Sequence, residues 1–147
     1  ENTVLPSTYM NAKNGILQKR AESDIATEMC RKLRVKTPSY EKIVNQLSGG
    51  NQQKVIIAKW LMMYPKVLIL DEPTRGIDVG AKSEIYQIMN ELTEQGVSII
   101  MISSDMEEIM GMADRILVMC EGKISGELHK GEYTQEKILE YAAEVKK

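Results

Sequence analysis

The sequence predicts an α/β fold built around a parallel sheet, and three neighbouring segments support this prediction. Residues 67–70 read Val-Leu-Ile-Leu, the composition of a strand buried on both faces of a parallel sheet. The next segment has apolar residues on one helical face, and a second apolar run follows it at residues 97–102. A strand, a helix and a strand in this order are typical of the crossover unit from which parallel sheets are built.

Two helices are predicted ahead of this unit. The apolar residues of the first recur every four positions: Ala21, Ile25, Met29 and Leu33. This spacing gives the helix one apolar face and leaves its charged residues on the other. The second helix is predicted over residues 51–64, where Pro65 ends it.

The predicted elements after the second strand are a helix, a hairpin and a final helix. The helix begins near Ser104. Apolar segments at residues 116–119 and 123–128 flank a Glu-Gly turn at 121–122, the pattern of a β-hairpin. A terminal helix is predicted from about Thr134.

Composition and charge exclude several classes of function. Nineteen Lys and Arg residues stand against 21 Asp and Glu, so no strong field favours nucleic acid or anionic lipid. No apolar run approaches the roughly 20 residues that a membrane-spanning helix needs. Cys30 and Cys120 lie far apart in mainly apolar sequence, which favours free buried thiols in a reducing cytoplasm over a disulfide. The single histidine, His129, is expected to be exposed to solvent.

A polar, glycine-rich turn at residues 47–55 leads into the second helix. It reads Leu-Ser-Gly-Gly-Asn-Gln-Gln-Lys-Val. The start of a helix leaves backbone N–H groups unpaired and carries a partial positive charge, and glycine lets a phosphate approach the backbone closely. The Ser48 hydroxyl adds another donor. A Ser-Gly-Gly turn alone is compatible with an ordinary helix cap, but the string here is longer.

The whole string resembles the signature motif of the ATP-binding cassette (ABC) family. Its Asn-Gln-Gln-Lys, in place of the usual Gln-Arg-Gln-Arg, resembles the variant found in sugar importers of the ribose, xylose and galactoside type. In that family the motif caps the γ-phosphate of ATP held by the facing cassette of a head-to-tail pair. The resemblance therefore implies that Ser48, Gly49 and Gly50 contact ATP of the partner cassette, with Gln52 as a weaker candidate.

An acidic pair after the first predicted strand matches a second motif of the family. The resemblance implies that Asp71 holds Mg²⁺, directly or through water, and that Glu72 orients or deprotonates the attacking water. In isolation, such a pair could equally cap a helix or form a salt bridge. Asp78 matches the aspartate of the family's loop across the dimer seam, and it could also cap the following helix.

Two features expected of the family are missing from the sequence. Ser104 stands where the family has a histidine that contacts the γ-phosphate, and Ser104 with Glu107 fits a capping box, so a structural role explains this serine. The phosphate-binding loop Gly-x-x-x-x-Gly-Lys-[Ser/Thr] is absent. Gly126 and Gly131 have the right separation, but Glu132 stands where lysine is required. We therefore expect the isolated chain to be inactive toward ATP.

The resemblance also implies the domain organisation. It predicts a partial P-loop NTPase core of the ABC ATPase type with an N-terminal helical subdomain. Residues 1–20 are interpreted as an irregular remnant of an upstream core, 21–64 as the helical subdomain with the signature motif, and 65–147 as the C-terminal part of the core. A missing central strand would leave sheet edges exposed, so we expect the chain to self-associate.

The resemblance implies that the chain is part of the ATP-hydrolysing subunit of a monosaccharide importer. Such a subunit uses ATP and Mg²⁺ and lies at the inner face of a bacterial cell membrane as a peripheral protein. The implied partners are a second nucleotide-binding cassette, membrane-spanning permease subunits and, indirectly, a periplasmic or extracellular sugar-binding protein, without nucleic acid. Ser104 in place of histidine implies two unequal ATP sites. The alternative is a soluble cassette ATPase acting on nucleic acid or ribosomes, which the near-neutral charge disfavours.

Overall fold

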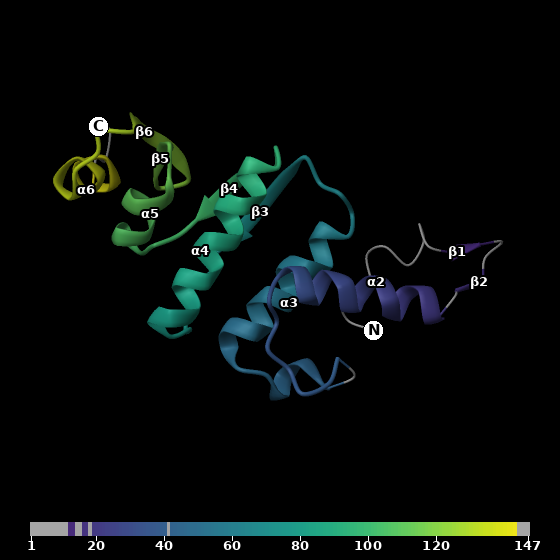
Figure 1. Ribbon diagram of the computed structural model, residues 1–147. Coiled ribbons are helices and arrows are strands. Elements are labelled where there is room, and N and C mark those ends of the chain that lie inside the picture. Colours follow the sequence, from purple (N-terminus) through teal and green to yellow (C-terminus); the bar gives the residue numbers. More distant parts are fainter. Residues whose placement is uncertain (1–11, 14–15, 18, 41, 144–147) are drawn as a thin grey trace. The chain divides into compact units, whose positions relative to one another are not determined.

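The chain forms two compact units, Glu1–Ile100 and Met101–Lys147. The structure is a computed structural model (Figure 1), and the residues that it describes are 12–13, 16–17, 19–40 and 42–143. The interpretation of residues 1–20 falls mostly outside this described part. The division of the chain at residues 20 and 64 stays a prediction.

The described part of the first unit starts with two short antiparallel strands and continues as helices. Its elements up to the signature motif are β1 (Ala12–Lys13), antiparallel to β2 (Ile16–Leu17), then α2 (Lys19–Lys32), the 3-10 helix η2 (Val44–Gln46) and α3 (Gly49–Leu61). The predicted first helix is confirmed as α2, with Cys30 and Leu33 buried at its end. Helix α3 ends before the predicted residue 64, because Tyr64 has a φ of 48° and precedes Pro65, which disfavours helical geometry.

The predicted strand, helix and strand are all present. Strand β3 (Val67–Asp71) and strand β4 (Ser98–Ile102) are neighbours in a parallel sheet and are connected by α4 (Val79–Glu94). The apolar face predicted for α4 is confirmed, since all four of its members are buried: Ile85, Ile88, Met89 and Leu92. This parallel crossover unit establishes the α/β class.

Only one face of strand β3 is buried, which corrects the prediction that both would be. Leu68 and Leu70 are buried, whereas Val67 is 51% and Ile69 is 63% exposed. On the neighbouring strand, Ile100 is 52% exposed. Side chains alternate between the two faces of a sheet, and the described residues of the first unit do not cover this second face.

The second unit is a hairpin packed between two helices. It consists of α5 (Met106–Met112), β5 (Arg115–Cys120), β6 (Lys123–His129) and α6 (Gln135–Ala143). Strands β5 and β6 are antiparallel, as predicted. Glu121 and Gly122 both have positive φ, 49° and 78°, the geometry of the two-residue turns that suit the twist of a hairpin.

The core of the second unit is small and apolar. Its buried side chains come from the hairpin and from α6, and they are Ile116, Val118, Leu128 and Ile138. Met106, Ile109 and Tyr141 pack against this cluster from the flanking helices. The apolar side chains that α5 and α6 contribute to this cluster are thus packed within the unit itself.

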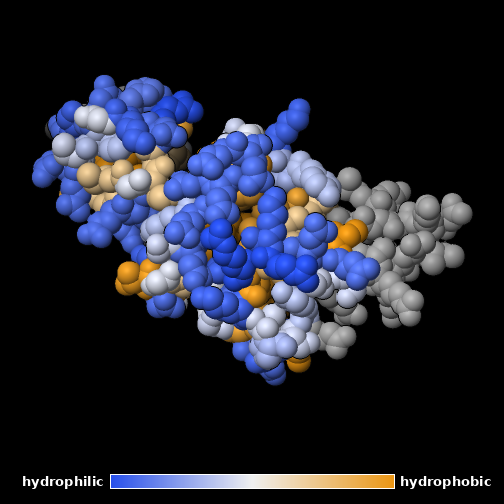
Figure 2. Space-filling model, viewed as in Figure 1, coloured by the Kyte–Doolittle hydropathy of each residue, from blue (hydrophilic) through white to orange (hydrophobic). Residues whose placement is uncertain are grey.

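Several expectations from composition are confirmed. Cys30 and Cys120 are both free thiols, although only Cys30 is fully buried. His129 has a side chain that is 62% exposed. Among the described residues, no helix combines the length and the apolar content needed to cross a membrane. Hydrophilic residues dominate the face shown in Figure 2, and smaller hydrophobic areas lie between them.

Candidate functional site

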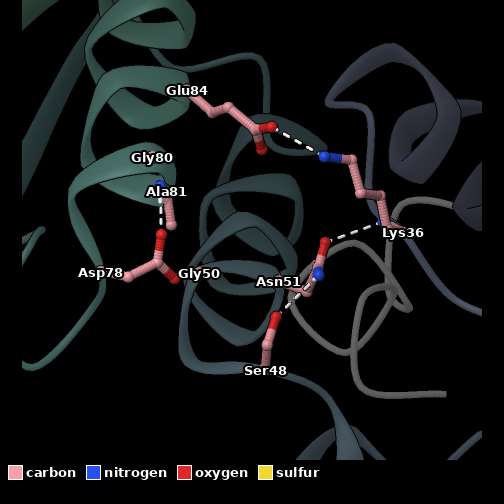
Figure 3. A pocket seen from close by; sticks show the side chains of 8 residues that line it. All are labelled: Lys36, Ser48, Gly50, Asn51, Asp78, Gly80, Ala81 and Glu84. Atoms are coloured by element: carbon pink, nitrogen blue, oxygen red, sulfur yellow. Dashed lines mark hydrogen bonds and ion pairs between the residues drawn. The ribbon is translucent and has the colours of Figure 1, made fainter.

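A pocket of about 280 Å³ lies between the signature motif and the start of α4 (Figure 3). On the side of the signature motif its lining residues are Lys36, Ser48, Gly50 and Asn51. On the α4 side they are Asp78, Gly80, Ala81 and Glu84. Three of the predicted site residues, Ser48, Gly50 and Asp78, therefore meet at one place in the first unit.

The signature turn, residues 48–50, packs against the loop that follows β3. A Cβ atom on Gly49 would lie 3.1 Å from Cγ2 of Ile77, and one on Gly50 would lie 2.5 Å from Cβ of Ala81. The second distance leaves no room for any side chain. Glycine at position 50 is thus required by close packing of the two segments.

The N-terminus of α3 has no capping side chain. Ser48 is the residue before the helix, but its hydroxyl makes no capping hydrogen bond, and the first turn holds no acidic residue. Backbone N–H groups in the first turn of a helix have no intrahelical partner and carry a partial positive charge. This end of α3 is therefore suited to an anion.

Asn51 fixes the orientation of the Ser48 side chain. The Asn51 Nδ2 amide donates to Ser48 Oγ at 2.8 Å, and Asn51 Oδ1 accepts from the backbone N–H of Lys36 at 2.7 Å. Gln52 instead donates its side-chain amide to the carbonyl oxygen of Leu47 at 2.8 Å. Gln52 thus stabilises its own turn. Asn51 is a site residue that was not predicted from the sequence.

Asp78 lines the pocket and also caps α4. Its Oδ1 atom accepts from the backbone N–H of Ala81 at 2.9 Å. Of the two readings left open by the sequence, the helix cap is confirmed. The side chain remains exposed, so the cap does not compete with a role at a dimer seam.

Two lysines share one carboxylate beside the pocket. Glu84 Oε1 lies 2.8 Å from Lys36 Nζ, and Glu84 Oε2 lies 2.6 Å from Lys54 Nζ. Hydrogen bonds from Lys36 and then from Lys54 lower the pKa of Glu84 from its ordinary 4.5 to about 2. The hydrogen bond to Glu84 also raises the pKa of Lys36. This cluster was not predicted from the sequence, because its members come together only where α3, α4 and the segment after α2 pack against one another.

Asp71 and Glu72 lie at the carboxyl end of β3 and do not line the pocket. Asp71 is exposed and Glu72 is half-buried, with a φ of 46° in the left-handed region. A non-glycine residue held in that region is uncommon and often marks a functional position. No group of three metal-ligating side chains occurs among the described residues. A single carboxylate nevertheless fits Mg²⁺, which usually keeps several water ligands and binds substrate phosphates.

Ser104 belongs to the second unit, and the capping box predicted for it is wrong. Helix α5 begins one residue later than that box requires, and its cap is Asp105, which accepts from the backbone N–H groups of Glu107 and Glu108. Ser103 Oγ in turn donates to the buried carboxylate of Glu108. Aspartate caps a helix as well as serine does, so the sequence Ser-Ser-Asp left the register ambiguous.

Comparisons with known proteins show which family this chain resembles. A family model described as ABC transporter matches residues 1–75. The chain is 57% identical over 142 residues to the ribose import ATP-binding protein RbsA of Oceanobacillus iheyensis, covering 97% of this chain and 29% of that protein. The corresponding protein of Bacillus subtilis is 55% identical over 142 residues, again with 97% of this chain and 29% of the relative covered.

The fold is also that of solved cassettes. The dimeric structure of MJ0796, a bacterial ABC transporter cassette, matches with a TM-score of 0.74 at 25% identity, covering 90% of this chain and 56% of that chain. The chain thus spans 29% of the curated relatives' length and about half of a solved cassette. The family model covers half of the chain, including the signature turn. This chain belongs to the ABC transporter family.

Proposed function

We propose that this chain is part of the ATP-hydrolysing subunit of a monosaccharide importer. The support is its identity of 55–57% to proteins named as ribose import ATP-binding proteins. In this proposal the signature turn closes over the γ-phosphate of ATP held by a second cassette. The dimeric structure of the related cassette MJ0796 is consistent with such a pair.

The observation that carries the proposal is the open N-terminus of α3. Ser48 and Gly49 are exposed, the helix has no capping side chain, and no acidic residue occupies its first turn. A terminal phosphate that approaches from a facing cassette would meet unpaired N–H groups and the Ser48 hydroxyl. Because Ser48 already accepts a hydrogen bond from Asn51, its own proton is available for a phosphate oxygen.

The residues after β3 serve the ATP site of this chain's own cassette. Asp71 would hold Mg²⁺, directly or through water, and Glu72 would orient or deprotonate the attacking water. Bound Mg²⁺ neutralises charge on the β- and γ-phosphates. The left-handed backbone of Glu72 turns the chain sharply after the strand and leaves this carboxylate at the end of the sheet.

The proposed partners follow from the importer assignment. They are a second cassette, permease subunits in the membrane and, indirectly, a sugar-binding protein, with the ATPase at the inner face of the membrane. The alternative, an ATPase acting on nucleic acid or ribosomes, gains no support from the names of the relatives, which refer to ribose import.

Replacing Ser48 by Glu in the complete transporter tests the role of the signature turn. Ser48 is exposed and does not cap α3, so the change spares the fold but places a carboxylate where the γ-phosphate docks. We expect ATP turnover to fall at least about 100-fold, because a like charge replaces a donor in a closed site. Gly50 is less suitable for this test, since any side chain there collides with Ala81.

Two further variants make the result specific. Ser83→Glu adds the same charge to an exposed position of α4 outside the pocket and should leave turnover unchanged. Glu72→Gln removes the base of a site that already lacks the histidine, so it should cost much less than Ser48→Glu. A Ser48→Glu transporter with normal turnover would disprove the proposed role of the turn. If Glu72→Gln lowers turnover as much as Ser48→Glu does, this chain's own ATP site is a working catalyst, and the proposed inequality of the two sites is wrong.

A further inference from the structure

Lys54 is a charged side chain enclosed by the first unit. The side chain is only 1% exposed. Its Nζ atom lies 2.6 Å from Glu84 Oε2 and donates to the backbone carbonyl oxygen of Arg34 at 3.0 Å. One ammonium group therefore joins α3 both to α4 and to the segment that follows α2.

The same two helices approach each other closely one turn earlier. Gly50 and Lys54 are four residues apart and lie on one face of α3. Ala81 and Glu84 are three residues apart and lie on one face of α4. The tight contact between Gly50 and Ala81 is thus followed directly by the ion pair between Lys54 and Glu84.

This helix contact determines how the starts of the two helices are placed relative to each other. Helix α3 starts after Ser48 and α4 starts after Asp78, and both residues line the same pocket (Figure 3). A shift of α3 along or away from α4 would change the separation of Ser48 and Asp78. The ion pair lies little more than one turn from both helix starts, close enough to control that separation.

Stability alone does not account for an ion pair with one buried partner. Enclosing the Lys54 ammonium costs desolvation energy, whereas the Glu84 side chain stays 39% exposed, and a well-packed apolar residue at a position such as 54 is often equally stable. A charge-assisted hydrogen bond differs from an apolar contact in accepting a narrow range of distances and directions. Glu84 also binds Lys36 through its second oxygen, and its low pKa keeps the carboxylate ionised above about pH 2.

We propose that the ion pair between Lys54 and Glu84 is a positioning device that holds the signature turn and Asp78 at a fixed separation. Both groups then reach the facing cassette together when the dimer closes on ATP. The inference rests on the proposed function, and it assigns to two residues outside the signature turn a role in its activity. Neither residue touches the nucleotide in this proposal.

The test compares Lys54→Met with Arg34→Met in the complete transporter. Lys54→Met removes the buried ammonium and leaves Glu84 paired with Lys36. Arg34→Met is the matched control: it breaks an exposed ion pair, at 2.8 Å, between the same segment after α2 and Glu91 farther along α4. The measurements are kcat, the ATP concentration for half-maximal turnover, and the thermal unfolding midpoint.

We expect Lys54→Met to raise the ATP concentration for half-maximal turnover by about tenfold and to lower kcat, since a misplaced turn weakens closure on ATP. Arg34→Met should leave both values within about twofold of the unchanged protein. A merely structural role predicts another result, namely less folded protein with an unchanged ATP requirement. That result, or normal kinetics in Lys54→Met, would overturn the proposal.

Glu84→Gln provides a second route if Lys54→Met does not fold, and it should likewise raise the ATP concentration for half-maximal turnover, because it removes the carboxylate that pairs with Lys54. Where both single variants fold, the double variant Lys54→Met/Glu84→Gln should be no worse than the more severe single variant, because both changes break the contact between Lys54 and Glu84. Additive effects on the ATP requirement would contradict a shared role. The Ser48→Glu experiment distinguishes failure of the positioning role from failure of the proposed function. If Ser48→Glu abolishes turnover while the Lys54 and Glu84 variants behave normally, the proposed function stands and only the positioning role fails.

Discussion

At the scale of single residues, hydrogen-bond direction decides what the signature turn can offer a phosphate. Asn51 donates to the Ser48 hydroxyl oxygen and accepts from the Lys36 backbone. An amide can do both at once, whereas a carboxylate only accepts. The Ser48 proton is therefore not used in the hydrogen bond with Asn51.

Replacing Asn51 by Asp should reverse this arrangement. The carboxylate would accept the Ser48 proton, which removes the donor from the phosphate side and adds a negative charge beside it. We expect turnover of the complete transporter to fall by about 100-fold, the usual cost of losing one preorganised donor. Steady-state ATPase assays measure this effect.

Asn90→Asp is the matched control for charge. Asn90 is an exposed amide on the same unit, in the fourth turn of α4 rather than at its start. It should retain turnover within about twofold. Equal losses in the two variants would show that added charge, rather than the orientation of Ser48, limits activity.

At the scale of secondary-structure elements, the second unit depends on a glycine in β6. Gly126 pairs with Val118 of β5, and a Cβ atom at this position would collide with the ring of Tyr141 from α6. The ring therefore lies directly over the strand backbone. Close approach of an aromatic ring is a specific reason for glycine within a strand, where it otherwise weakens the sheet.

Gly126→Ala should destabilise the second unit by about 1–3 kcal/mol, because Tyr141 has to move out of a packed position. Hydrogen exchange of the β5 and β6 amides measures the loss locally. Gly111→Ala is the control, since a Cβ atom there meets no atom within 4 Å and alanine favours a helix. Equal protection in the two variants would mean that Tyr141 does not pack on β6 in solution.

Much of this fold follows from periodicity. The apolar face of α4, the hairpin with its Glu121-Gly122 turn and the strand-helix-strand order were predicted from local patterns. Helix ends were less accurate, because capping depends on backbone geometry: α5 is capped by Asp105 although Ser104 fits the same pattern. The uncovered face of β3 was also missed, since an apolar run does not reveal what lies against it.

The candidate site was predictable only in part. The residues of the signature turn were identified by their motif, whereas the structure was needed to show that Ser48 and Gly50 line one pocket with Asp78. The pairing of Lys54 with Glu84 was not predicted, because it joins residues 30 apart whose contact depends on helix packing. Spacing within a motif shows which groups are present, while their orientation requires the three-dimensional structure.

At the scale of the whole molecule, the described chain leaves one side of its parallel sheet uncovered. Val67, Ile69 and Ile100 project from this face and are each more than half exposed. A contiguous apolar sheet face is a site where another surface is expected to bind. The chain spans 29% of its curated relatives' length, and we predict that this chain alone buries the face by self-association.

Light scattering on the isolated chain checks this prediction. We expect dimers or larger species, which Ile69→Thr shifts toward the monomer, because the change removes apolar area from the centre of the exposed face. Ile43→Thr is the matched control, since Ile43 is also 63% exposed but lies outside the sheet. A monodisperse monomer over a wide concentration range, or equal effects of the two changes, would contradict association through this face.

The contact between Gly50 and Ala81 also restricts how this region can evolve. Position 50 already holds the smallest amino acid, so a larger residue at position 81 has no compensating change available on the other helix. A larger residue at either position would push the signature turn away from the start of α4. Variation among descendants of this sequence should therefore accumulate on the outer faces of these helices, while the two positions remain fixed together.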